Sequence, residues 1–263
     1  MGLGDWIMAT AEARGLQKTD PRPVVAVNKR GHPTWSEVFE NNPRFAPKGT
    51  PISDDVQVLS SRSGNRPYID YKKSTSSRWA WKNCPPEPGE IYFSPEEQEK
   101  IDTKITSFIY VEPTIKDKAP PNKQWPFERW QQLVAIKGRD WIQSGPQRSA
   151  EHMLGGVYQC VSHTFREALV TLARCHMYVG HEGAMHHAAA ALGIPAVVIY
   201  GGFVSPAQTG YESQINLCSG GEPCGRRVEC AHCATSMRAI TVRDVLDAIE
   251  TLEGQIHGTS ESK

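Results

Sequence analysis

The sequence predicts an α/β protein whose main sheet is parallel and carries helices on both faces. Two observations lead to this prediction. In residues 106–263, short runs of β-branched residues alternate with segments whose apolar residues recur at helical spacing. In addition, the chain opens on "MGLGDWIMATAEARGL", a glycine-aspartate turn that runs into a helix. In doubly wound proteins such a turn normally follows a buried strand and points at a ligand.

Composition limits the class of protein. The chain has 263 residues, with 29 Lys and Arg against 29 Asp and Glu, which argues against a partner recognised by bulk charge. No apolar run is long enough for a membrane span, and residues 1–16 lack a signal-peptide core, so we expect a cytoplasmic protein. Seven cysteines, an odd number, do not suggest a secreted disulfide framework.

The first half is predicted to be short and irregular. Asp5 stands where a helix N-cap belongs, ahead of a helix over 6–16. Strands are predicted in "RPVVAVNKRG" (22–31), "DDVQVLSSRSG" (54–64) and "RPYIDYKK" (66–73). After another strand at "IYF", a helix is expected to start at Ser94, with Pro95 in its first position and Glu97 completing a capping box.

The second half has a clearer alternation of strands and helices. We predict strands in "SFIYVEP", "DWIQSG", "HMYVGHEG" and "PAVVIYGG", and helices in 126–138, 163–175, 184–193 and 240–254. The boundary between the halves is placed near 100–106, which gives a first domain over 1–105 and a second over 106–263.

The most informative stretch is "YVGHEGAMHHAAAALGIPAVVIYGG", residues 178–202. A strand ends at Gly180, and a helix is expected to start near Ala184. The first amides of this helix, over residues 183–186, would be unpaired and suit a phosphate. Glu182 could accept hydrogen bonds from ribose hydroxyls. An ordinary strand-turn-helix crossover has the same pattern, so this stretch alone leaves both interpretations open.

Other candidate residues follow from their positions. Lys123 lies in the loop after "YVEP" and could neutralise a phosphate, although loop lysines are often only solvated. His186 and His187 belong to the first turn of the helix, where one could contact the phosphate or both could pack in the core. Gln143 ends a predicted strand and could meet the base or ribose of a nucleotide.

Several motifs together resemble a known family. They are "KQWPFERW" (123–130), "HEGAMHHAAAALGIP" (181–195), "GGFVSPAQTGY" (201–211) and "CGRRVECAHCATSMRAITVRDVLDAI" (224–249). This combination is similar to the glycosyltransferase family that contains the bacterial ADP-heptose:lipopolysaccharide heptosyltransferases. The resemblance covers about 106–250 and the start of the first hundred residues.

The resemblance implies a GT-B-like fold, in which two Rossmann-like domains with parallel sheets face each other across a cleft. The N-terminal domain, which would take the acceptor, is reduced in this chain, so an acceptor other than heptosyl lipopolysaccharide is expected. The opening stretch is similar to the family's strand-turn-helix element, and it places Asp5 at the position of the catalytic base. The strand itself is missing, either because it lies upstream of Met1 or because the protein dispenses with it.

The implied reaction is transfer of a hexosyl or heptosyl group from a nucleotide diphosphate sugar to an acceptor hydroxyl, such as that of a glycan, with inversion. Asp5 would take the proton. Lys123 and the amides of Gly183, Ala184, Met185 and His186 would stabilise the charge that develops on the leaving diphosphate. No metal or other cofactor is then required for catalysis.

The cysteines suggest a separate structural role. Cys218, Cys224, Cys230 and Cys233 have the spacing C-x5-C-x5-C-x2-C, with His232 nearby. Four thiolates could bind zinc, but the spacing departs from paired C-x2-C motifs, and the resembling family carries such cysteines without needing metal for catalysis.

Two alternative functions remain open. One is transfer to a hydroxymethylated base of viral DNA. Basic and aromatic residues alternate in "DYKKSTSSRWAWK", where Lys72, Lys73, Arg78, Trp79 and Trp81 could contact phosphates and stack on bases. The other is a non-catalytic protein that binds a nucleotide or sugar, which the missing first strand suggests. A dinucleotide-dependent dehydrogenase is disfavoured, because no G-x-G-x-x-G follows a strand.

Overall fold

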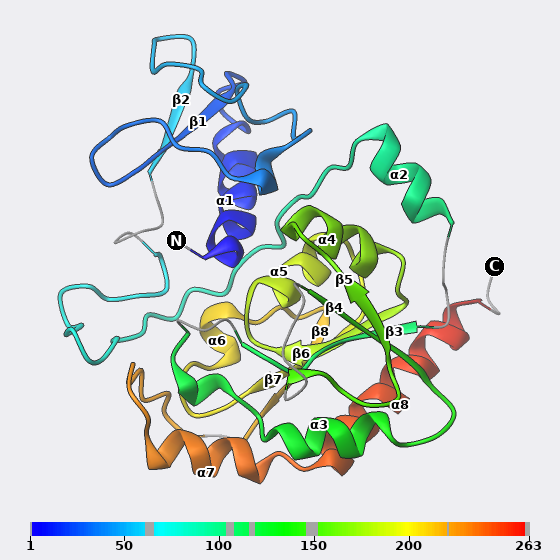
Figure 1. Cartoon of the computed structure of the whole chain (residues 1–263). Helices are drawn as coiled ribbons and strands as arrows, with labels where there is room; N and C mark the ends of the chain where they lie inside the picture. Colours follow the sequence, from blue (N-terminus) through cyan, green and yellow to red (C-terminus); the bar gives the residue numbers. More distant parts are fainter. Residues whose placement is uncertain are drawn as a thin grey trace.

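The computed structural model describes residues 2–60, 66–103, 108–115, 119–145, 152–219 and 221–260 (Figure 1). Its elements in chain order are α1 (Leu3–Leu16), β1 (Val24–Val27), the 3-10 turn η1 (Glu37–Phe39), β2 (Gln57–Ser60), α2 (Pro95–Asp102), β3 (Phe108–Glu112), the 3-10 turn η2 (Pro121–Lys123), α3 (Phe127–Val134), β4 (Asp140–Gly145), β5 (Tyr158–Val161), α4 (Phe165–Ala173), β6 (Met177–His181), α5 (Ala184–Ala191), β7 (Ala196–Tyr200), α6 (Pro206–Thr209), β8 (Gln214–Cys218), α7 (Ala231–Ala239) and α8 (Val242–Ser260).

Two parallel sheets organise the fold. Six strands form the main sheet in the order β5-β4-β3-β6-β7-β8, and β1 pairs with β2 in a separate sheet. The chain enters the main sheet at β3, runs outward to β5, returns to β6 beside β3, and then runs outward to β8. This is the doubly wound arrangement, so the predicted α/β class with two parallel sheets is confirmed.

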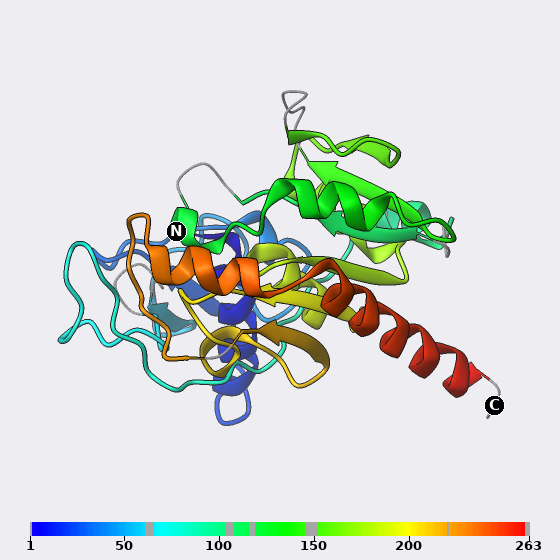
Figure 2. The ribbon, with the colours of Figure 1, turned by 90° about the horizontal axis from the view of Figure 1, so that it is seen from below.

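Helices cover both faces of the main sheet (Figures 1 and 2). Successive residues of a strand point to opposite faces, so Tyr178 packs towards α4 and α5 while Val179 packs towards α3 and α8. The first of these apolar clusters also includes Trp6 and Ile7 of α1 and Val24 of β1. The two sheets therefore share a hydrophobic core, although they are separate hydrogen-bonded units.

Three predictions about the first half are wrong. Residues 91–93 ("IYF") form no strand before α2, and the carbonyl of Tyr92 accepts a hydrogen bond from the Arg166 side chain rather than from a strand. Residues 66–73 form no strand, because their backbone pairs locally with residues 80–82, leaving one isolated bridge between Ile69 and Trp81. Asp5 is not the N-cap of α1: the helix begins at Leu3, and the Asp5 carboxylate accepts the backbone N–H of Gly2 at 3.3 Å from inside the first turn. The predicted domain boundary falls in 104–107, outside the described residues.

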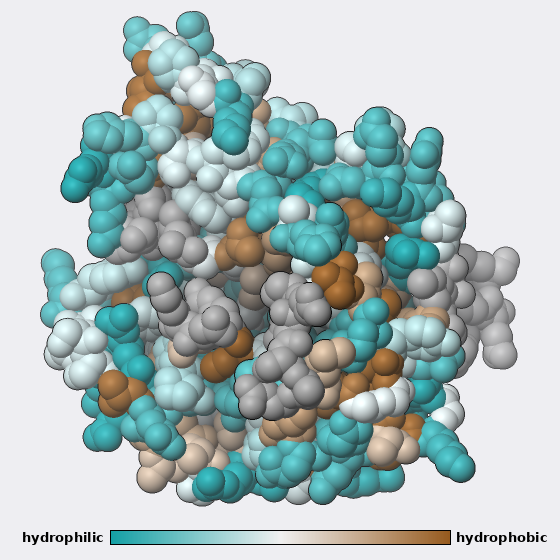
Figure 3. Space-filling model, in the orientation of Figure 1, coloured by the Kyte–Doolittle hydropathy of each residue, from teal (hydrophilic) through white to brown (hydrophobic). Residues whose placement is uncertain are grey.

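The capping box of α2 is confirmed. The Ser94 hydroxyl accepts the N–H of Glu97 at 3.2 Å, and the Glu97 carboxylate accepts the N–H of Ser94 at 2.8 Å. Within the described part of the chain, no helix has the length and apolar character needed to cross a membrane. On the face drawn in Figure 3, hydrophobic residues form small separate patches among hydrophilic ones.

A buried histidine fixes the entry into α3. His181, at the end of β6, accepts the backbone N–H of Trp125 on its Nε2 at 2.8 Å, and its ring lies edge-on to Trp130. The neutral ring therefore carries its proton on Nδ1. Burial, helped by the nearby Lys123 cation, lowers the pKa of His181 to about 3.

This pKa predicts an acid-sensitive fold. An unfolded histidine titrates near pH 6.5, so between that pH and about pH 3 the unfolded chain binds a proton that the folded chain does not. Stability should fall as the pH drops through this window, with His181 contributing about 2 kcal/mol between pH 7.5 and pH 5. Urea unfolding at both pH values checks this. The loss should be smaller in His181→Gln, and an equal loss in both proteins would contradict the assignment.

Candidate functional site

The candidate site lies at the carboxyl ends of β3 and β6, where the strand order reverses. In open α/β sheets, ligands bind in the crevice outside such a switch point. Glu112 ends β3 and pairs in register with Gly180 of β6, one residue before His181 and two before Glu182. The sheet topology therefore brings the predicted turn at Glu182 to the position where a ligand is expected.

Lys123 and Glu182 form an ion pair at this edge. Lys123 comes from η2, and its side chain is 19% exposed. Glu182 directly follows β6, and its side chain is 8% exposed. Burial by itself raises the pKa of Glu182, but the charge and the hydrogen bond of Lys123 act in the opposite direction, and the net pKa lies below the usual value. Glu182 is thus ionised at neutral pH, and Lys123 also lies 5.4 Å from the centre of the Phe203 ring.

The first turn of α5 is only partly available to a ligand. The N–H of Gly183 donates to Nδ1 of His186 at 2.8 Å, so this amide is already used. His186 lies 2.9 Å from the carbonyl of Thr209 through Nε2, which must therefore carry the proton of the neutral ring. Burial lowers the pKa of His186, in keeping with that neutral form.

The next three amides of the same turn remain open. The amides of Ala184, Met185 and His186 lie in the first turn of α5, and the first amides of an α-helix have no acceptor within the helix. Ala184 is half-buried, whereas the Met185 and His186 side chains are fully in the core. The turn therefore offers backbone N–H groups, rather than side chains, to an anion.

Asp5 reaches the same region from the first half of the chain. α1 packs on α5 so closely that a Cβ on Gly4 would lie 2.6 Å from the His187 ring and 3.3 Å from the Ala184 Cα. Asp5, the next residue, is 6% exposed, and its charge influences Glu182. The structure thus brings together Asp5, Lys123, Glu182 and the amides of α5.

The Asp5 carboxylate is already surrounded by donors. Arg66 Nε lies 2.9 Å from both of its oxygens, and Arg66 Nη2 lies 2.9 Å from Oδ2. The Tyr68 hydroxyl donates to Oδ1 at 2.7 Å. Sequence reasoning missed Arg66 and Tyr68, because "NRPY" carries no motif and the contact spans about sixty residues.

Aromatic residues lie between the ion pair of Asp5 and the ion pair of Glu182. The Arg66 guanidinium lies 5.1 Å from the centre of the Trp79 ring, and Trp79 lies 6.0 Å from Phe203, which contacts Lys123. The Arg227 guanidinium also lies over Trp79, at 5.3 Å. Trp79 and Trp81 are half-buried in packing contacts, and their remaining surface lines a pocket together with Lys73 and Arg78.

Gln143 serves a different part of the sheet. Its side-chain oxygen accepts the N–H of Leu154 at 3.0 Å, and its Nε2 donates to the carbonyl of His152 at 2.9 Å. The side chain is 2% exposed and holds the connection between β4 and β5. Its amide group is therefore committed to the protein and does not join the residues around Lys123.

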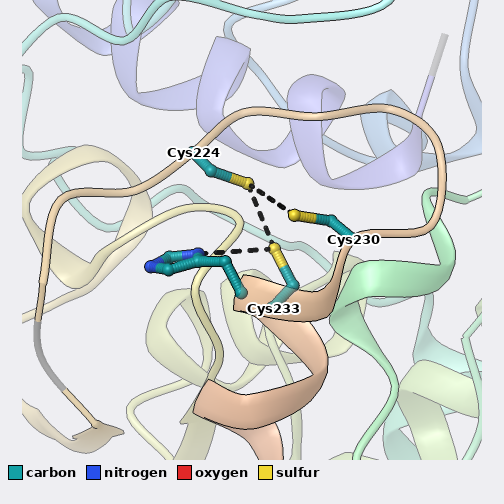
Figure 4. Close-up of side chains that lie close together, drawn as sticks. Cys224, Cys230 and Cys233 are labelled. Carbon is teal, nitrogen blue, oxygen red and sulfur yellow. Dashed lines mark hydrogen bonds between the residues drawn. The ribbon is translucent and has the colours of Figure 1, made fainter.

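Among the described residues, two groups of side chains have the residue types of a metal site. Glu182, His186 and His187 lie within 4.8 Å of one another, but they are already engaged by Lys123, the Thr209 carbonyl and the Tyr211 hydroxyl. The second group is Cys224, Cys230, His232 and Cys233 (Figure 4). Cys218, at the end of β8, is not part of it.

Comparison with known proteins gives structural matches only. No protein-family model matches the chain, and no curated protein matches it either. Among solved structures, a glycosyl transferase family 9 protein from Veillonella parvula has a TM-score of 0.66 at 16% identity, over 96% of this chain and 94% of that one. The ADP-heptose lipopolysaccharide heptosyltransferase II of E. coli has a TM-score of 0.61 at 15% identity, over 97% of both chains.

A third match is the iron-containing dodecameric glycosyltransferase TibC of enterotoxigenic E. coli, with a TM-score of 0.68 at 14% identity. It covers 97% of this chain and 74% of TibC. At these identities the matches establish the fold and leave the activity to be argued from the site. The resemblance noted in the sequence is thus confirmed in the structure: the chain has the GT-B fold of the heptosyltransferases and glycosyltransferase family 9.

Proposed function

We propose that the chain is a glycosyltransferase that moves a sugar from a nucleotide diphosphate to an acceptor hydroxyl, with inversion. The observation that carries this proposal is the meeting of Asp5, from the first half, with Lys123, Glu182 and the open amides of α5, from the second. Such a transfer needs a carboxylate that accepts a proton and a positively charged site that binds the diphosphate, and both lie here at the switch point of the sheet.

The second half, 106–263 in the domain division proposed from the sequence, would hold the donor. Lys123 and the amides of Ala184, Met185 and His186 would contact the diphosphate, whose negative charge grows as the glycosidic bond breaks. Glu182 holds Lys123 in place. When the diphosphate pairs with Lys123 instead, the Glu182 carboxylate can accept hydrogen bonds from ribose hydroxyls. Asp5 and Glu182 each already pair with a cation of the protein, which supports transfer without a metal at the diphosphate.

The first half would position the acceptor and the base. An ionised carboxylate has about four lone-pair sites, and in this structure those of Asp5 are occupied by Arg66, Tyr68 and Gly2. An acceptor hydroxyl can therefore donate to Asp5 only after one of these donors has moved. We infer that acceptor binding displaces Arg66, whose guanidinium can pair with an anionic or polyhydroxyl acceptor instead.

The occupied carboxylate also favours a second candidate, a protein that binds a nucleotide sugar without transferring it. The two candidates differ only in Asp5: the transferase needs its carboxylate, whereas the binding protein does not. The half-buried positions of Trp79 and Trp81 give no support to transfer onto a DNA base.

Donor binding is tested by thermal unfolding against ADP-, UDP-, GDP- and CDP-sugars. A ligand at about a hundred times its dissociation constant adds roughly 2.7 kcal/mol, which raises the Tm by several degrees in a chain of this size. One nucleotide class should stabilise the protein. The shift should be lost in the double variant Lys123→Met/Glu182→Gln, which removes both charges of the buried pair and leaves neither unpaired.

Lys137→Met is the matched control, because Lys137 is exposed after α3 and should leave the shift unchanged. Absence of any shift in the unmodified protein would rule out the donor site.

The base is tested by Asp5→Asn, which keeps the size of the side chain and removes its basicity. Transfer should fall by about 10²–10⁴-fold while the donor-induced Tm shift persists. Asp54→Asn, at an exposed position, serves as the control. Release of nucleotide from the identified donor, measured with candidate acceptors, reports the rate. Unchanged transfer in Asp5→Asn would contradict its role, and donor binding without transfer to any acceptor would favour the binding protein.

A further inference from the structure

The described residues contain a second chemically distinctive cluster, away from Asp5 and Glu182. Cys224 lies in the connection after β8, Cys230 directly precedes α7, and His232 and Cys233 belong to the first turn of that helix (Figure 4). The Sγ of Cys224 is 4.0 Å from that of Cys230 and 3.1 Å from that of Cys233, and Cys233 Sγ is 4.0 Å from His232 Nδ1. All four potential ligand atoms lie within 4.8 Å of one another.

The surrounding backbone is shaped to hold these side chains together. Cys230 and Cys233 form a C-x2-C pair across the start of a helix. The N–H of Cys224 donates to the carbonyl of Gly202 at 2.8 Å. A Cβ on Gly202 would lie 2.5 Å from the His232 ring, so a glycine is needed there to admit the imidazole.

We propose that Cys224, Cys230, His232 and Cys233 bind one zinc ion. Three thiolates and an imidazole are a set of ligands that zinc takes in tetrahedral structural sites, with Zn–S bonds of about 2.3 Å. Tetrahedral geometry then places neighbouring sulfurs roughly 3.8 Å apart. The separation of Cys224 from Cys230 already fits, whereas Cys224 and Cys233 must move apart by about 0.7 Å. The N–H of Arg226, 3.4 Å from Cys224 Sγ, supplies a donor to the thiolate.

The ion would fasten the two halves of the chain through the loop over 224–230. From the first half, the N–H of Trp79 donates to the carbonyl of Gly225 at 2.9 Å, and Arg227 donates to the carbonyl of Ser76 at 2.9 Å. From the second half, Asn122 donates to the carbonyls of Arg226 and Val228, at 2.7 Å each.

Asn122 directly precedes Lys123 in η2, so the same loop helps to position the cation of the candidate donor site. The zinc would therefore stabilise the contact between the two halves of the chain and take no part in the transfer. This last link, from the loop to Lys123, rests on the proposed function.

The metal itself is tested on the full chain, purified without chelator, by elemental analysis. We expect about one equivalent of zinc in the unmodified protein and its loss in Cys233→Ser and Cys230→Ser. Cys218→Ser is the matched control and should retain the zinc, because Cys218 is outside the cluster. Absence of metal, or equal zinc in Cys233→Ser, would overturn the proposal. Iron in the same amount, lost in the same variants, would overturn the choice of zinc.

Replacement by cobalt gives a spectroscopic check that is independent of folding yield. Co²⁺ added to the metal-free protein should give thiolate charge-transfer bands and the intense visible bands of a tetrahedral site. His232→Ala changes an exposed residue, so this variant should fold, and it should bind Co²⁺ at least tenfold more weakly with altered visible bands. Identical spectra and affinity in His232→Ala would overturn the assignment of His232.

The fastening role is tested by chelation. Removing zinc should lower the Tm by several degrees in the unmodified protein and leave Cys233→Ser unchanged. It should also weaken binding of ADP, or of whichever nucleotide the unfolding panel identifies. If no nucleotide binds even with zinc present, the donor site fails while the metal measurements stand. If chelation changes neither Tm nor nucleotide binding, the fastening role is overturned.

Discussion

The close packing of α1 against α5 is the contact on which the candidate site depends. Gly4 leaves no space for a side chain between the backbone of α1 and the residues Ala184 and His187 of α5. Because backbone approaches backbone here, Asp5 is fixed beside the open amides of the second half. The same contact joins the apolar residues of α1 to the core of the main sheet, so the two sheets are not independent bodies.

Charge balance is the second constraint on the site. Asp5 pairs with Arg66 and Glu182 pairs with Lys123, and each partner comes from a different segment of the chain. Leaving one such buried charge unpaired costs about 3–5 kcal/mol, so the carboxylates hold the cations in place. In the proposed function, an anionic ligand would compete with these carboxylates for the same cations. The charged groups are therefore organised in advance by their internal partners.

Regular local patterns made much of the fold predictable. Buried strands such as β6 and β7 are continuous apolar runs, and the residues around Ser94 satisfy both ends of a capping box. The edge strands β5 and β8 were not predicted, because "YQCV" and "QINLC" mix polar and apolar residues and gain their order from a neighbouring strand. The strand predicted over 66–73 is wrong for the opposite reason. These residues have the composition of a strand, but their backbone makes only one isolated bridge to a nearby segment.

The sequence by itself determined the α/β order and the position of the turn before α5, because both follow from spacing within short segments. It also singled out Lys123 and Glu182 as candidates, because each follows a predicted strand. It indicated the cysteine cluster as well. The predicted set included Cys218 and placed His232 only nearby, whereas the observed group contains His232 and not Cys218. Only the tertiary structure decided that Arg66 and Tyr68 surround Asp5, that Gln143 is committed to the β4–β5 connection, and that His186 uses the amide of Gly183. The contacts of Asp5 join residues about sixty positions apart, and the partners of Gln143 and His186 depend on how a loop and a helix turn fold back, so none of them leaves a periodic pattern in the sequence.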